Sequence, residues 1–243
     1  MKWLLSLLAA LGLAIGSGWL VAQAYFWVVE GEATAAVELP APSAAGDAGP
    51  EEPVPEPPAL LPVFAVAGGV RLRLPTARPV ALAYHEASMP RRIALQPLGS
   101  CVKCRNRWKF RPPRIGPSDL EYMVMDSRGR PAPATSAVDM VVRRRDRIRS
   151  PVTGTVWRFR RYRLYGRYPD ARVAIVPDGR PDRLVVLIHL RDVHVRPGDR
   201  VVASETVLGR PRRFPFESQV DRYVGAGFSH VHLEVKRPSA RRT

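Results

Sequence analysis

The sequence predicts an all-β domain, a sandwich or a barrel, behind an apolar N-terminal segment. From Phe64 onward the apolar residues form short, strand-like runs. Gly, Pro and Asp separate these runs and mark turns. No stretch from 64 to 243 keeps apolar residues at a 3.6-residue period long enough for a core helix. Together these observations favour two layers of sheet around one core.

The first thirty residues predict a transmembrane anchor over residues 1–30. Residues 3–29 carry no charge, and about 20 apolar residues suffice to cross a bilayer. Lys2 precedes this run and Glu30 follows it, so the C-terminal domain should lie outside the cytoplasm. The triplet Ala22-Gln23-Ala24 leaves open a cleaved signal, which would release a secreted protein after Ala24.

Composition divides the rest of the chain. Residues 31–62 are rich in Pro, Ala and Glu and predict an extended linker. Residues 63–133 are expected to form a β-rich lead-in subdomain or further strands of the same sheet. Residues 134–238 carry the main β domain, and residues 239–243 a basic tail.

The charge is concentrated in the β-rich part. The whole chain has a net charge of +16. Residues 1–63 hold one lysine and seven acids, so the remaining residues carry +22. A domain this basic attracts polyanions. Because the domain is expected outside the cytoplasm, nucleic acid is excluded as a partner, and cell-wall polymers and lipid head groups remain.

The expected strands follow one another along the second half of the chain. They are indicated by "GTVWRFRRYRLYG" (154–166), "RVAIVPDG" (172–179), "RLVVLIHL" (183–190) and "VHVRPGDRVVASETVLG" (193–209), the last with Pro-Gly-Asp in a turn. In the first, arginines alternate with aromatic residues, which predicts a solvated basic face opposite a packed aromatic face.

Two of the five histidines are one residue apart, in "SHVHLEV" (229–235). In a strand, alternate residues share a face, so His230 and His232 should point the same way, about 7 Å apart. The pair predicts one edge of a metal site. Alone, an H-x-H step more often indicates two surface or half-buried histidines on a β face.

Four motifs occur in a particular order: "SPVTGTV" (150–156), "VLIHL" (186–190), "VRPGDRVVASETVLG" (195–209) and "SHVHLEV" (229–235). Together they resemble the LytM/lysostaphin-type zinc endopeptidases of bacterial cell walls over about residues 134–236. The resemblance implies a barrel-sandwich hybrid, or β-sandwich of the LytM type. It also implies a zinc ion and cleavage of peptide crosslinks in peptidoglycan.

The resemblance assigns metal ligands to Asp139 and His232 and catalytic roles to His189 and His230. The sequence departs from the family at the first ligand. Four residues before Asp139 the family has histidine, and this chain has Thr135. A catalytic zinc normally has three protein ligands, and a threonine hydroxyl is a poor one. His85, the only histidine before Asp139, is the candidate third ligand; otherwise it is a packed histidine at a sheet edge.

Two functional hypotheses follow. In one, the LytM-like fold is kept with an incomplete zinc site, and the domain binds peptidoglycan or regulates another envelope protein. In the other, a third ligand from elsewhere completes an active zinc endopeptidase. The missing histidine favours the first, and retention of the other motif residues favours the second.

Cys101 and Cys104 form a C-x-x-C, and there are no other cysteines. Outside the cytoplasm this spacing predicts a local disulfide. The segment 212–225 lies between the Pro-Gly-Asp turn and the H-x-H strand, so its Phe214, Phe216 and Tyr223 are expected to line a groove.

Overall fold

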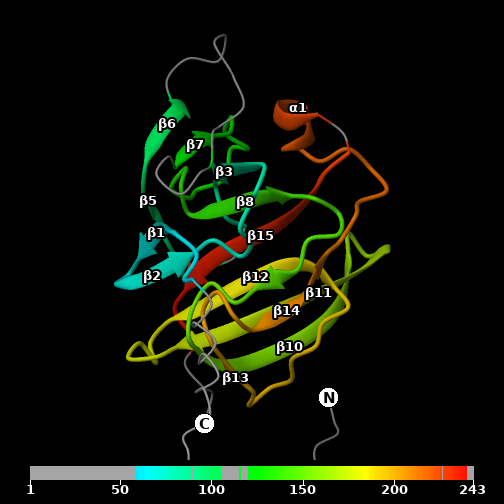
Figure 1. Ribbon diagram of the computed structural model, residues 1–243. Helices are drawn as coiled ribbons and strands as arrows, with labels where there is room; N and C mark the ends of the chain where they lie inside the picture. Colours follow the sequence, from blue (N-terminus) through cyan, green and yellow to red (C-terminus); the bar gives the residue numbers. More distant parts are fainter. Residues whose placement is uncertain (1–58, 89, 105–114, 116–119, 226, 240–243) are drawn as a thin grey trace, which may run out of the picture. The chain divides into compact units, whose positions relative to one another are not determined.

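The computed structural model describes residues 59–88, 90–104, 115, 120–225 and 227–239 (Figure 1). Residues 55–243 form one compact unit. The predicted anchor at 1–30, most of the linker and most of the basic tail lie outside the described residues. Within those residues, no helix is both long and apolar enough to cross a membrane.

The described residues bear out the all-β class. They contain fifteen strands and one four-residue helix, α1 (Asp221–Val224). A small sheet has the order β2-β1-β5, and a twelve-stranded sheet follows the path β13-β10-β11-β12-β15-β8-β3-β7-β6. The small-sheet strands are β1 (Val63–Ala67), β2 (Val70–Arg73) and β5 (Gln96–Pro97). The large-sheet strands are β3 (Ala81–His85), β4 (Arg92–Ile93), β6 (Ser100–Lys103), β7 (Glu121–Val124), β8 (Ala137–Val142), β9 (Ile148–Arg149), β10 (Gly154–Leu164), β11 (Tyr168–Pro177), β12 (Leu184–Arg191), β13 (Arg200–Val201), β14 (Val207–Pro211) and β15 (Ser229–Lys236).

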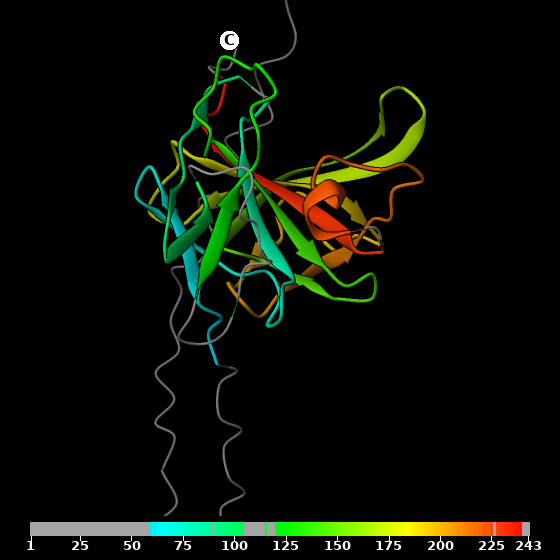
Figure 2. The same cartoon turned by 90° about the horizontal axis from the view of Figure 1, so that it is seen from above.

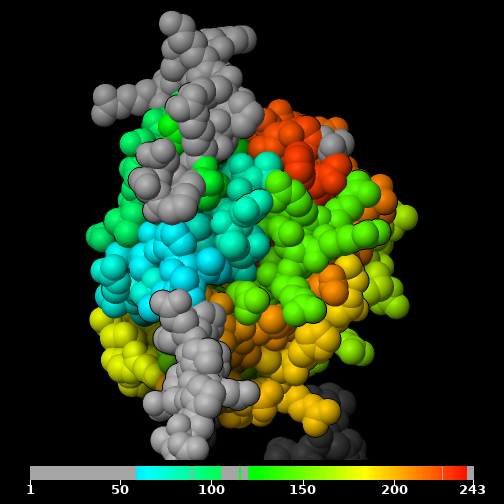
Figure 3. Space-filling view, in the orientation of Figure 1, coloured from blue at the N-terminus to red at the C-terminus, as the bar shows by residue number. Residues whose placement is uncertain are grey.

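The predicted lead-in and main segments contribute to one sheet. β3 pairs antiparallel with β8, and β4 pairs with β15. β7 pairs in parallel with β3. In the space-filling view the cyan residues of β1 to β3 and the green residues around β8 lie side by side (Figure 3). This pairing places residues 81–85 directly beside residues 137–141.

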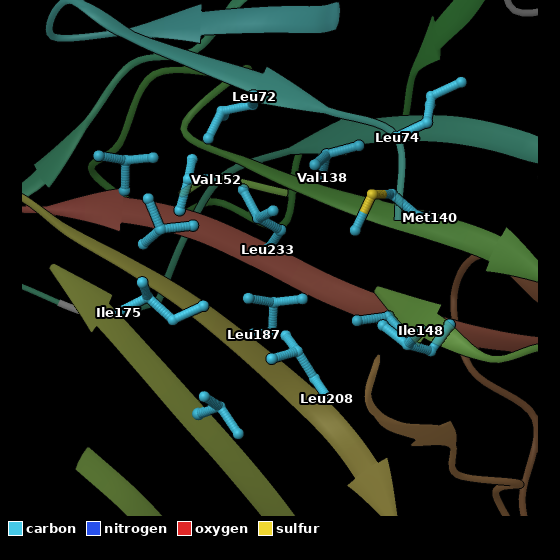
Figure 4. Packing of buried hydrophobic residues seen from close by; sticks show 14 of the residues in the cluster. Leu72, Leu74, Val138, Met140, Ile148, Val152, Ile175, Leu187, Leu208 and Leu233 are labelled. Carbon is cyan, nitrogen blue, oxygen red and sulfur yellow. The ribbon is translucent and has the colours of Figure 1, made fainter. Parts of the chain in front are cut away.

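The core lies against one face of the large sheet. On β15, Leu233 is fully buried in the core, whereas His232 and Glu234 alternate with it and face the other way. Figure 4 shows Leu233, Val138, Leu187 and Ile175 from four neighbouring strands packed together beneath Leu72. Truncating a leucine at such a position typically costs about 2–5 kcal/mol of stability. The opposite face of the same strands carries polar groups together with two smaller apolar clusters, around Val141 and around Val186.

The turn at Pro197-Gly198-Asp199 forms as predicted. Gly198 has φ +94°, a left-handed conformation that a side chain disfavours. The amide of Arg196 donates to the Asp199 carboxylate at 2.7 Å and closes the turn. β13 follows the turn, but residues 193–195 before it are not in a strand.

Candidate metal centre

A cavity of about 640 Å³ lies on the face of the large sheet away from the core. Its lining includes Asp139, His189, His230 and His232. In Figure 2 the yellow-green β10–β11 hairpin projects from the sheet, with the orange segment before α1 beside it. Ring contacts join the two, because Phe216 lies 5.7 Å from Tyr165 and 5.1 Å from Tyr168 between ring centroids. The four site residues expected from the resemblance thus converge on one hollow.

His85 is buried next to Asp139 and His232, although it is not part of the described cavity lining. The Nε2 atom of His85 lies 3.0 Å from Oδ1 of Asp139, and the Nδ1 atom of His232 lies 2.9 Å from the same oxygen. The ligand atoms of the three residues all lie within 4.8 Å of one another. Tetrahedral zinc, with bonds of about 2.0–2.1 Å to nitrogen and oxygen, separates its ligand atoms by about 3.3 Å. The three residues could therefore hold a metal ion.

Strand register explains this convergence. Asp139 pairs with His232 on β15 and with Ala83 on β3. His85, two residues beyond Ala83, points to the same face of the sheet. The third ligand therefore comes from the strand beside Asp139, and not from four residues earlier on the strand of Asp139 itself.

The hydrogen bonds of His85 orient its second ring nitrogen towards Asp139. Nδ1 of His85 lies 2.9 Å from the backbone oxygen of Glu86, which can only accept, so Nδ1 carries a proton. In the neutral ring Nε2 then presents a lone pair to the Asp139 carboxylate. Two lone pairs 3.0 Å apart repel each other. A metal ion bound by both atoms would remove this repulsion.

The groups around Asp139 keep its carboxylate ionised. Burial alone would raise the pKa of Asp139, but the charges of His85 and His230 and the hydrogen bonds from His232 and His85 outweigh it and hold the pKa well below its ordinary value. The carboxylate therefore stays ionised in its buried position.

Asp139 and Glu234 raise the pKa of His232, whereas burial lowers it. Burial lowers the pKa of His232, yet its hydrogen bonds and charge interactions with Asp139 and Glu234 raise it to about 9. Glu234 is fully buried, with Oε2 4.0 Å from Nε2 of His232. A carboxylate behind a histidine ligand is typical of protein metal sites.

Thr135, which stands at the position of the family's first ligand, is engaged elsewhere. Its hydroxyl donates to the carbonyl of Leu95 at 2.9 Å, and the amide of Leu95 donates back to the carbonyl of Thr135 at 2.9 Å. These reciprocal bonds attach the start of β8 to the segment before β5. Thr135 therefore has a structural partner, whereas His85 belongs to the group of three residues that could hold a metal ion.

The carboxylate of Glu86 holds the loop of residues 127–130 in place. It makes no described hydrogen bond to the ring of His85. The Glu86 carboxylate accepts from the amides of Arg128 at 2.9 Å and Arg130 at 3.1 Å, and from the hydroxyl of Ser127. The loop places Nη2 of Arg128 3.6 Å from Oδ2 of Asp139. Sequence reasoning did not identify Arg128, since nothing distinguishes it among 34 arginines.

A β-bulge brings His189 to the site. His189 stands between Ile188 and Leu190 in the sequence. Strict alternation along β12 would turn its side chain towards the core. The pairing with β11 shifts here, because Ala171 pairs with Leu190 and Arg172 with Ile188, which leaves His189 as an extra residue. Its φ is +70°, a strained value for a residue with a side chain. The bulge rotates the imidazole onto the cavity face, 5.2 Å from the ring of His230.

His230 is a neutral, buried histidine. It is 5% exposed, and burial, the largest influence, lowers its pKa to about 4. Its ring lies 4.9 Å from that of Phe214 between centroids. At neutral pH it can therefore donate or accept a hydrogen bond without carrying charge.

Asp170 contacts His189, and Tyr162 contacts Asp170. The Asp170 carboxylate lies 2.6 Å from Nδ1 of His189, and the Tyr162 hydroxyl lies 2.7 Å from the same carboxylate. The alternation of arginines and aromatic residues predicts Tyr162 as a packed aromatic residue, and no motif in the sequence points to Asp170. The only signal in the sequence was one acid in an otherwise apolar and basic strand.

The expectations for the 212–225 segment are met in part. Phe214 and Phe216 line the cavity and stack on each other at 5.0 Å between ring centroids. Tyr223 is absent from the described lining, and its hydroxyl accepts from the amide of Asp126 at 2.9 Å. Cys101 and Cys104 lie at disulfide distance, with Cα atoms 5.9 Å apart, as predicted.

A scan against protein families, a search of curated proteins and a search of solved structures found no match to this chain.

Proposed function

We propose that this chain is a LytM-like zinc endopeptidase of the cell envelope, held to the membrane by residues 3–29, that cleaves peptide crosslinks of peptidoglycan. The fold proposed for it is the LytM-type β-sandwich. His85, Asp139 and His232 are the proposed zinc ligands, and His189 and His230 the proposed catalytic residues. The motif order along residues 134–236 supports the family, and the geometry of the cavity supports the chemistry.

One observation carries the proposal. His85 supplies the donor that the sequence lacks at Thr135, so three ligand atoms stand around one point with His189 and His230 beside them. Three protein ligands leave a fourth position for water or substrate, as a catalytic zinc site requires. A purely structural zinc site would be closed by a fourth protein ligand.

Each residue has a chemical role in this proposal. A bound zinc ion would lower the pKa of its water and polarise the scissile carbonyl. His189, the more exposed of the two catalytic histidines, takes the proton of the attacking water and returns it to the leaving amine. His230 is uncharged at neutral pH and donates a hydrogen bond to the oxyanion that develops on the carbonyl.

A second function is favoured by Arg128. Its guanidinium lies 3.6 Å from Asp139 and carries a positive charge beside the place that a metal ion would take. Burial, the largest influence, lowers the pKa of Arg128. If the guanidinium satisfies Asp139 in place of zinc, the domain keeps the fold without the chemistry. It would then bind peptidoglycan or regulate another envelope protein.

Zinc content and turnover distinguish the two functions. The purified full chain should bind about one zinc ion per chain and release crosslinked muropeptides, and both properties should be lost in His232→Ala. His194→Ala is the matched control, because His194 is exposed and outside the cavity. A metal-free protein that binds peptidoglycan without cleaving it would establish the second function and exclude the first.

A further inference from the structure

Asp170 on β11 is a buried carboxylate with three donors around it. Its side chain is 0% exposed. Oδ2 lies 2.6 Å from Nδ1 of His189 and 2.7 Å from the hydroxyl of Tyr162. Oδ1 accepts from the amide of Ala171 at 2.7 Å. A buried carboxylate is costly unless it is paired and hydrogen-bonded, and this one is fully engaged.

These contacts determine which atoms around the Asp170 carboxylate carry protons. An ionised carboxylate only accepts, so Ala171, Tyr162 and His189 are all donors. Burial, followed by the charge of Asp170, raises the pKa of Tyr162, so its hydroxyl stays protonated. Nδ1 of His189 therefore carries a proton, and Nε2 on the other side of the ring keeps its lone pair. Among the described residues, none is hydrogen-bonded to that Nε2 atom.

The pairing of the strands places the Nε2 lone pair of His189 at the cavity. β10 and β11 pair Tyr162 with Asp170, so both side chains lie on the cavity face of the sheet. The bulge turns His189 to that face, and Tyr162, His189 and Asp139 line the same cavity. The ring of His189 lies 6.1 Å from that of His232 between centroids, at the edge of the metal centre. Strain at a functional residue persists where its surroundings fix it, and the contact with Asp170 does so here.

We propose that Asp170, held by Tyr162, is the positioning residue that keeps His189 in the Nδ1–H tautomer and so makes Nε2 the proton acceptor of the site. The inference rests on the proposed peptidase function and adds two residues that the family resemblance did not supply.

The proton balance is simple. An O–H bond of the attacking water breaks, and its proton joins Nε2 of His189 while the oxygen bonds the scissile carbon. The imidazolium then faces the Asp170 carboxylate, which stabilises its charge. As the C–N bond breaks, Nε2 returns the proton to the leaving nitrogen. Peptide and water give one carboxylate terminus and one amine terminus, and His189 ends as it began.

The tautomer of His189 can be measured without any enzymatic activity, and it tests the proposal directly. In the full chain labelled with ¹⁵N-histidine, the nitrogen shifts of His189, assigned with His189→Gln, should show a protonated Nδ1 and a bare Nε2 at about pH 8. Asp170→Asn keeps the size of the side chain but turns an amide donor towards the ring, so the proton should move to Nε2. Tyr162→Phe leaves the carboxylate in place and should keep the wild-type tautomer.

Asp178→Asn is the matched control, because Asp178 is exposed and pairs with Arg200 at the far end of β11. With turnover established, Asp170→Asn should lower kcat by about 10²–10⁴-fold at unchanged zinc content. Asp178→Asn should lower neither kcat nor zinc content.

Two results would overturn the inference. One is a wild-type His189 protonated at Nε2, which decides the matter even if Asp170→Asn does not fold. The other is an Asp170→Asn protein with full turnover. If the wild type binds zinc but cleaves no muropeptide, the proposed function fails, and the tautomer measurement still decides the role of Asp170.

Discussion

The Nε2 atom of His85 lies 3.0 Å from the Oδ1 atom of Asp139, although the two residues are 54 positions apart in the sequence. The pairing of β3 with β8 produces this contact, and in the proposed zinc site His85 takes the role of the ligand absent at Thr135. The contact is a metal centre in the proposed peptidase. In the second function it is a hydrogen bond between two packed residues, with Arg128 in the place of the metal.

His85→Ala should abolish zinc binding. Removing one of three ligands leaves only Asp139 and His232, so affinity should fall by more than the 10–100-fold typical of losing an outer-sphere partner. Competition with a chromogenic chelator measures it, and His194→Ala serves as control. Unchanged zinc affinity in His85→Ala would remove His85 from the metal centre.

Thr135→Ala should leave zinc binding intact. The hydroxyl of Thr135 donates to the carbonyl of Leu95, so the substitution removes one partly buried hydrogen bond. Such a loss costs about 1 kcal/mol of unfolding free energy. Urea unfolding and zinc titration of the same preparation test both parts. A zinc affinity that falls with Thr135→Ala would mean that the threonine ligates the metal.

Arg128→Gln should raise zinc affinity. The guanidinium 3.6 Å from Asp139 repels a cation in the site, and two like charges a few ångströms apart interact by a few kcal/mol at an effective dielectric of about 20. A tenfold or larger gain is expected. Arg200→Gln is the control, since its partner Asp178 is on the surface. Turnover that appears only in Arg128→Gln would show that the arginine suppresses the enzyme.

The stabilisation conferred by zinc should increase from pH 6.5 to pH 9. In the metal-free protein the pKa of His232 is about 9, above its value in the unfolded chain. The folded state therefore holds the proton more tightly, and its contribution to stability is complete below about pH 6.5 and lost as the pH rises through 9. Zinc must displace this proton, so its affinity rises over the same window. The difference in Tm between zinc-loaded and metal-free protein, measured across this range, should widen; a constant difference would contradict the shift.

Cys101 and Cys104 should titrate as zero free thiols in the native, unreduced protein. The bridge closes a very short loop, so the Cys101→Ser/Cys104→Ser double variant should lose only about 2 kcal/mol of stability or less. Its zinc content should match the wild type, because neither cysteine contacts the described centre. Two free thiols in the native protein would refute the disulfide.

Local periodicity made much of the fold predictable. The alternation in "SHVHLEV" placed His230 and His232 on one face and Leu233 on the other, and the structure agrees. The same rule fails at His189. One inserted residue in β12 reverses the face of a side chain, and no local pattern in "VLIHL" announces it.

The sequence by itself determined the β class and most strand faces, because strand alternation is a property of adjacent residues. The candidate ligands Asp139 and His232 came from the resemblance to the LytM family. Only the tertiary structure brought His85 and Arg128 next to Asp139, and Asp170 next to His189. These contacts depend on the register between strands and on loop positions. Register is set by packing of the whole core, which no single segment of the sequence encodes.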